Sequence, residues 1–181
     1  MPRKKVLVVD DSAFMRKMIG DMINSDDELE VVGKAGNGQE ALEKIKELQP
    51  DVVVLDMEMP VLDGLSTLSR IMESQALPVI IFSSLSQKGT EQTLKALQLG
   101  AVDFVAKPSG QISLDVLSVK EELIKKLKVA ANTSRKLPVY QSLHEPVAKA
   151  KKTLPDQDRK LNKLVVIAAS TGGPKALHQV I

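Results

Sequence analysis

Residues 4–12 read KKVLVVDDS, an apolar run that ends in two aspartates and a serine. A continuous β-branched run without polar alternation is typical of a strand buried on both faces of a parallel sheet. Ser12 can cap a helix, because apolar residues recur at helical spacing from Phe14 to Ile23. The stretch therefore predicts a strand followed directly by a helix, with acidic side chains at the turn between them.

The same alternation continues through the first two thirds of the 181 residues. Further strands are predicted over 29–32, 52–55, 78–82 and 102–105, and further helices over 39–48, 65–73, 90–99 and 112–129. Five strands alternating with five helices predict an α/β fold, a doubly wound five-stranded parallel sheet with right-handed crossovers. In such sheets, ligands bind beyond the carboxyl ends of the strands.

Composition excludes several classes of protein. Hydrophobic residues make up 43% and charged residues 27% of the chain, which is ordinary for a globular protein. The absence of cysteine excludes a disulfide scaffold, a thiolate metal site and a cysteine nucleophile. No apolar run approaches the roughly 18 residues of a spanning helix, and 2% aromatic residues disfavour a base-stacking surface. We expect a cytoplasmic protein that neither inserts into membranes nor binds nucleic acid.

Charge and proline content divide the chain into three parts. Residues 1–128 carry 16 Lys and Arg against 20 Asp and Glu, whereas residues 129–163 carry 8 against 3. Helical and strand periodicity also ends there, and three prolines interrupt the sequence. We predict a first domain over 1–128, a linker over 129–162, and the first strand-turn-helix of a second, incomplete α/β domain over 163–181. The basic surplus lies in the linker, so it does not indicate a DNA-binding surface.

Five polar residues stand where predicted strands end: Asp10 and Asp11, Asp56, Ser83 and Lys107. Each alone has a plainer role as a helix cap, a turn residue or a solvated charge. Their joint placement instead predicts one site at one edge of the sheet. Converging carboxylates repel one another, and a hard cation such as Mg²⁺ relieves that repulsion. Lys107 could pair with Asp56 or with an added phosphoryl oxygen.

The motifs VVDDS around Asp10 and Asp11, VLDMEMP around Asp56, and AKP around Lys107, together with Ser83, resemble those of response-regulator receiver domains. The resemblance covers about residues 4–127. It implies a flavodoxin-like fold and a phosphoprotein in which Asp56 accepts a phosphoryl group from a histidine kinase.

The receiver resemblance also assigns roles to the other site residues. It implies that Mg²⁺ is held by Asp10, Asp11, Asp56 and the backbone carbonyl of Glu58. It further implies that Ser83 and Lys107 bind phosphoryl oxygens, that Phe104 is the aromatic switch residue of the fifth strand, and that the bond before Pro108 is cis. A plain core position for Phe104 stays open.

A second candidate site follows the linker, where residues 166–173 read VIAASTGG. A strand, a sharp turn and a helix would expose Ser170 beside helix N–H groups, as in a serine nucleophile. Ser170 could also cap the helix, or the glycines could cradle a phosphate. The order of receiver, linker and Ser170 turn resembles chemotaxis-specific protein-glutamate methylesterases (protein-glutamine glutaminases), although Ala168 stands where that family usually has glycine.

This second resemblance implies a serine hydrolase that demethylates methyl-glutamate side chains of chemoreceptors and deamidates glutamines, under the control of a chemotaxis histidine kinase. His178 would lie about 12 Å along the helix from Ser170, too far for a general base. We therefore expect a truncated triad and no esterase activity in this stretch alone. The alternative function is a stand-alone receiver that acts by phosphorylation-dependent protein binding. A DNA-binding regulator is disfavoured, because 164–181 does not read as a helix-turn-helix.

Overall fold

The computed structural model describes residues 2–74, 77–84, 86–108 and 113–132. They form strands and helices in strict alternation: β1 (Lys4–Val9), α1 (Ala13–Asn24), β2 (Leu29–Ala35), α2 (Gly38–Leu48), β3 (Val52–Leu55), α3 (Gly64–Ser74), β4 (Val79–Ser83), α4 (Gln87–Leu99), β5 (Asp103–Ala106) and α5 (Ser113–Asn132). The segment after Asn132, which includes most of the predicted linker and all of 163–181, lies outside the described residues.

The strands form one parallel sheet in the order β2-β1-β3-β4-β5. β1 pairs with β3 from Val6 opposite Val52 to Val9 opposite Leu55, so the strands that end in aspartates are neighbours. The chain reverses its direction of travel across the sheet between these two strands, which makes their carboxyl ends the switch point of the fold. The predicted doubly wound, flavodoxin-like architecture is confirmed.

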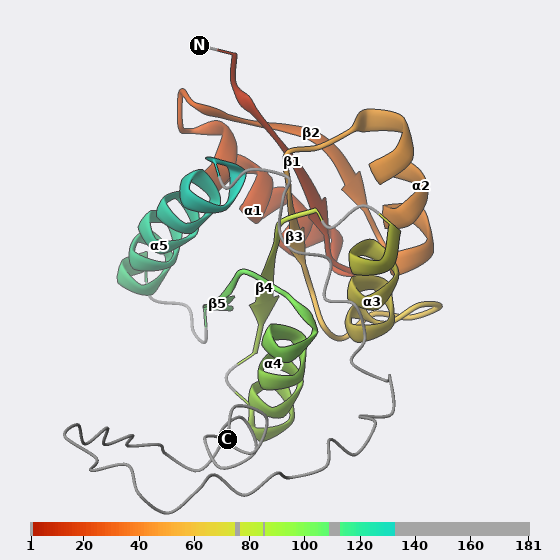
Figure 1. Cartoon of the computed structure of the whole chain (residues 1–181). Coiled ribbons are helices and arrows are strands. Elements are labelled where there is room, and N and C mark those ends of the chain that lie inside the picture. Colours follow the sequence, from red (N-terminus) through yellow and green to blue (C-terminus); the bar gives the residue numbers. More distant parts are fainter. Residues whose placement is uncertain (1, 75–76, 85, 109–112, 133–181) are drawn as a thin grey trace, which may run out of the picture. The chain divides into compact units, whose positions relative to one another are not determined.

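Helices cover both faces of the sheet, with α1 and α5 on one face and α2, α3 and α4 on the other (Figure 1). Alternate residues of β1 serve the two layers: Val6 and Val8 pack under α1 and α5, whereas Leu7 and Val9 pack under α2 and α3. Because both faces are buried, the strand is apolar at every position rather than at every second one.

Two helices, α4 and α5, extend three residues past a predicted end. α4 begins at Gln87 because the Ser86 hydroxyl accepts a hydrogen bond from the amide of Gly89 at 3.0 Å and caps the helix there. α5 continues to Asn132, past the predicted domain end at residue 128, because Ala130 and Ala131 are still packed in the core.

Gly64, the first residue of α3, has no room for a side chain. A Cβ there would lie 2.2 Å from the carbonyl oxygen of Asp56 and 2.6 Å from the Cα of Met57, and backbone atoms cannot move aside cheaply. We expect Gly64→Ala to lower the free energy of unfolding by about 1–3 kcal/mol in urea titrations. Gly36→Ala is the control, since the nearest atom to its Cβ is 3.5 Å away. Equal losses in both variants would contradict the expectation.

Candidate functional site

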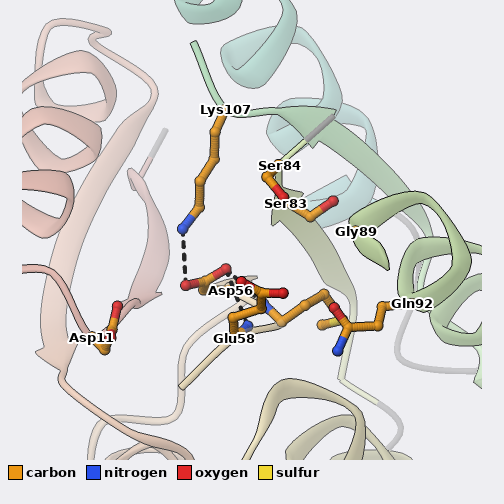
Figure 2. Close-up of a pocket in the computed structure, with 9 residues that line it drawn as sticks. Asp11, Asp56, Glu58, Ser83, Ser84, Gly89, Gln92 and Lys107 are labelled. Atoms are coloured by element: carbon orange, nitrogen blue, oxygen red, sulfur yellow. Dashed lines mark hydrogen bonds and ion pairs between the residues drawn. The ribbon is translucent and has the colours of Figure 1, made fainter. Parts of the chain in front are cut away.

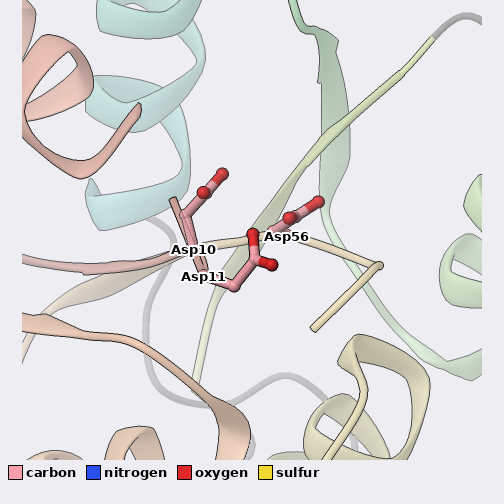
Figure 3. Close-up of side chains that lie close together, drawn as sticks. All are labelled: Asp10, Asp11 and Asp56. Atoms are coloured by element: carbon pink, nitrogen blue, oxygen red, sulfur yellow. The ribbon is translucent and has the colours of Figure 1, made fainter. Parts of the chain in front are cut away.

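The carboxyl ends of β1 and β3 bring three aspartates together. Asp10 and Asp11 follow β1 and Asp56 follows β3, and one carboxylate oxygen of each lies within 4.8 Å of the others (Figure 3). Asp10 and Asp56 are buried, with 0% and 3% of their surface exposed, whereas Asp11 is exposed. The cluster therefore places two desolvated carboxylates beside one that faces solvent.

Lys107, just beyond β5, balances part of this charge. Its Nζ lies 2.8 Å from Oδ2 of Asp56 (Figure 2). The same Nζ lies 2.9 Å from Oδ2 of Asp10. Burial opposes the charged form of the lysine, but the two carboxylates outweigh it and raise the pKa of Lys107, so the ammonium stays protonated.

The bond before Pro108 is trans, since no described peptide bond is cis, so the implied cis bond is wrong. The ammonium reaches both acids without it.

Asp56 is held in one orientation. Its Oδ1 accepts a hydrogen bond from the amide of Met57 at 2.7 Å, while Oδ2 faces Lys107. Burial is the main cause that raises the pKa of Asp56, the charge of Asp10 adds to it, and Lys107 opposes it. The net shift is upward because the cost of burial, with the charge of Asp10, outweighs the opposing ammonium of Lys107.

Arg16 in α1, a residue not predicted from the sequence, supports the main chain of the aspartate pair. Its guanidinium Nη1 donates hydrogen bonds to the carbonyl oxygens of Asp10 and Asp11, at 2.7 and 2.9 Å. The amide of Ser12 donates to Oδ1 of Asp10 at 2.8 Å. Together these bonds fix the turn that carries both carboxylates. The only sequence signal for Arg16 was its position in the first turns of a helix that follows an acidic pair.

A pocket of about 240 Å³ opens beside Asp56, between the loops after β3 and β4 and the first turns of α4 (Figure 2). Glu58, Ser83 and Gln92 contribute to its lining. At the surface, Nζ of Lys88 in α4 lies 3.1 Å from Oε1 of Glu58. The predicted site residues from β1, β3, β4 and β5 thus meet at one edge of the sheet, as the strand-end rule requires.

Ser83 and Phe104 lie at the boundary of this site. The buried Ser83 hydroxyl lies 2.7 Å from the Thr93 hydroxyl of α4. Phe104 is 39% exposed, and Nζ of Lys126 lies 5.0 Å from its ring centroid, so the alternative of a plain core aromatic is wrong in this conformation. A smaller cavity of about 80 Å³ separates α4 from β5, and Ser83, Thr93 and Phe104 all contribute to its lining.

The other predicted site, Ser170, lies outside the described residues, and so does His178. Among the described residues, no helix is long and apolar enough to cross a membrane.

A family model for the response regulator receiver domain matches residues 6–117. The chain belongs to this family. A solved structure with this receiver fold is the response regulator domain of CheB from Thermotoga maritima, which is 48% identical, has a TM-score of 0.65, and covers 72% of this chain and 97% of its own. A CheY6 from R. sphaeroides, solved with the P1 domain of CheA3, is 34% identical with a TM-score of 0.59, over 72% of this chain and 98% of that one. The first resemblance is confirmed.

Longer relatives of this receiver domain carry the name protein-glutamate methylesterase/protein-glutamine glutaminase. The one from Syntrophomonas wolfei is 96% identical over all of this chain and 51% of its own length. The one from Bacillus subtilis is 50% identical over 98% of this chain and 51% of its own length. The receiver chain therefore spans about half the length of the curated relatives that it matches, and their names agree with the second resemblance.

Proposed function

We propose that this receiver domain is a phosphorylation-controlled switch whose phosphoacceptor is Asp56. The observation that carries the proposal is the oriented Asp56 carboxylate, buried beside an open pocket and paired with Lys107. A carboxylate oxygen of Asp56 attacks phosphorus, the bond to the donor histidine nitrogen breaks, and the electron pair leaves with that nitrogen. That nitrogen takes a proton from solvent, so the products are an acyl phosphate on Asp56 and a neutral imidazole. The reaction needs positioning and charge neutralisation more than covalent assistance.

The aspartate cluster fits a magnesium ion. Its donors are carboxylate oxygens within 4.8 Å of one another, which is the ligand type that Mg²⁺ prefers. Asp10, Asp11 and Asp56, with the backbone carbonyl of Glu58, would hold the ion. When bound, Mg²⁺ neutralises charge that develops on the phosphoryl oxygens.

After transfer, the residues around the pocket act on the new phosphoryl group. Lys107 pairs with one phosphoryl oxygen, since its ammonium already lies 2.8 Å from the Asp56 carboxylate. The Ser83 hydroxyl donates to another oxygen. Phe104 then moves inward, toward the small cavity that it shares with Ser83. A local change in charge is thereby converted into a packing change at the surface.

Intact-mass measurement tests the switch directly. Incubation of the full 181-residue chain with acetyl phosphate and Mg²⁺ should add one phosphoryl group, because a small donor can enter the open pocket. Chelation of Mg²⁺ with EDTA should prevent the addition, since three clustered carboxylates repel an anionic donor. A protein that gains no phosphoryl group with Mg²⁺ present would contradict the proposal.

For the whole protein, we propose a cytoplasmic chemotaxis response regulator that demethylates methyl-glutamate side chains of chemoreceptors and deamidates glutamines. Its partners would be a chemotaxis histidine kinase and the methyl-accepting chemoreceptors, with Ser170 as the nucleophile of a serine hydrolase. The names of the longer relatives support this activity, and a solved complex of a CheY6 with a CheA3 P1 domain supports the kinase as partner. The alternative is a receiver that acts only by binding proteins after phosphorylation.

Methanol release separates these two functions. A longer protein that extends past Ile181 should release methanol from methylated chemoreceptors, and Ser170→Ala should stop the release because the nucleophile is lost. Ser142→Ala, a second serine change in the same chain, is the control and should leave the rate unchanged. The 181-residue chain alone should release none. Undiminished release by Ser170→Ala would remove this serine from the mechanism, and no release by the unsubstituted longer protein would leave the binding-only alternative.

A further inference from the structure

A chain of buried hydroxyls links the phosphorylation pocket to α4. The Ser83 hydroxyl lies 2.7 Å from the Thr93 hydroxyl, and the Thr93 hydroxyl donates to the carbonyl of Gly89 at 2.8 Å. Ser83 and Thr93 are 4% and 5% exposed, so water does not replace these bonds easily. A hydroxyl has one proton, and that of Thr93 is used at Gly89. Ser83 is therefore the donor in the bond to Thr93.

The direction of this bond restricts Ser83. A serine hydroxyl cannot donate its one proton to Thr93 and to a phosphoryl oxygen at the same time. In the proposed function, Ser83 donates to a phosphoryl oxygen on Asp56. The donation from Ser83 to Thr93 must therefore end each time the switch is turned on.

Thr93 cannot follow Ser83 toward the phosphoryl group. The first turn of α4 packs tightly on the loop after β4, since a Cβ on Gly89 would lie 2.3 Å from the carbonyl oxygen of Ser84. The Ser86 hydroxyl also caps this turn through the amide of Gly89. With the helix fixed against the loop, the rotation has to occur at the Ser83 side chain.

We propose that Thr93 is a positioning residue that holds the Ser83 hydroxyl away from Asp56 in the resting domain and so opposes the active conformation. The proposal rests on the proposed function of Asp56 and Ser83. Thr93 also contributes to the lining of the small cavity toward which Phe104 moves. Thr93 therefore contacts Ser83 and also lines the cavity that receives Phe104, so it takes part in both halves of the packing change.

Calorimetry on the full chain tests this role through the binding of beryllium fluoride in the presence of Mg²⁺, because beryllium fluoride mimics a phosphoryl group on the aspartate. Thr93→Val keeps the shape of the side chain but removes the acceptor for Ser83. It should bind beryllium fluoride about threefold to tenfold more tightly than the unsubstituted chain, because the resting state alone loses a hydrogen bond. A merely structural Thr93 would lower thermal stability without this gain in affinity.

Two control variants isolate the contact. Thr93→Ser retains a hydroxyl and should restore the original affinity. Ser74→Ala removes a hydroxyl of α3 that donates to a helix carbonyl, that of Arg70 at 2.8 Å, and it should leave the affinity unchanged. In a Ser83→Ala background, Thr93→Val should no longer tighten binding.

The outcomes distinguish the two proposals. If the unsubstituted chain binds beryllium fluoride but Thr93→Val binds no more tightly than Ser74→Ala, the role of Thr93 is overturned. If the unsubstituted chain does not bind it at all, the proposed function of Asp56 itself fails.

Discussion

Asp56→Asn is expected to abolish phosphoryl transfer from acetyl phosphate to the chain, measured as the loss of the added phosphoryl mass. The amide of asparagine keeps the shape of the side chain and can still accept the hydrogen bond from Met57. It lacks the anionic oxygen that attacks phosphorus, so the acyl phosphate cannot form. Complete loss is expected, because the neighbouring Asp10 is fully buried and so cannot replace Asp56 as the acceptor.

Two controls make this loss interpretable. Asp21→Asn removes an exposed carboxylate of α1 that pairs with Lys17, and it should leave phosphorylation unchanged. Asp56→Asn itself should be at least as stable as the unsubstituted chain at neutral pH in EDTA. Burial raises the pKa of Asp56, so its ionised form destabilises the fold above that pKa. Equal labelling of Asp56→Asn would mean that another residue is the acceptor.

Lys107→Met is expected to lower the free energy of unfolding by about 3–5 kcal/mol at neutral pH in EDTA. The substitution leaves the buried carboxylates of Asp10 and Asp56 without the ammonium that lies within 3 Å of both. Urea titrations measure the loss. Lys88→Met is the matched control, because its ion pair with Glu58 is exposed and worth at most about 1 kcal/mol.

The pH dependence of this loss identifies its cause. Without Lys107, the pKa of Asp56 should rise further above its ordinary value, because the lysine opposes the upward shift. A carboxyl with a raised pKa destabilises the folded state when it is ionised, so the deficit should be full at neutral pH and shrink as the pH falls. Mg²⁺ should also stabilise Lys107→Met more than the unsubstituted chain. A deficit that is independent of both pH and Mg²⁺ would indicate lost packing instead.

The backbone of the site could be predicted from the sequence because it depends on topology alone. Apolar runs predicted strands that end at Asp10 and Asp56, and parallel sheets collect strand ends at one edge. That rule was sufficient to bring the carboxylates and Lys107 together before any side chain was placed. The prediction succeeded because it required only the order and direction of the strands.

The contacts that orient the site could not be predicted in this way. Whether Ser83 meets Thr93, and whether Arg16 reaches the carbonyls behind the aspartates, depends on the rotation and exact start of α4 and α1. Helical spacing shows which residues share a face, but it does not show which neighbouring atom each polar group reaches. The start of α4 was itself predicted three residues late, since the cap at Ser86 was not recognised.

The sheet separates two layers of helices, α1 and α5 on one face and α2, α3 and α4 on the other. The apolar cluster under α1 and α5 shares no residue with the cluster under α2, α3 and α4. The proposed rearrangement of Ser83 and Phe104 lies along α4. Lys126 of α5 contacts Phe104 through its ring and through a hydrogen bond to its carbonyl oxygen at 2.6 Å. The proposed movements of Ser83 and Phe104 thus take place beside the cluster under α2, α3 and α4, and the cluster under α1 and α5 can stay packed while they occur.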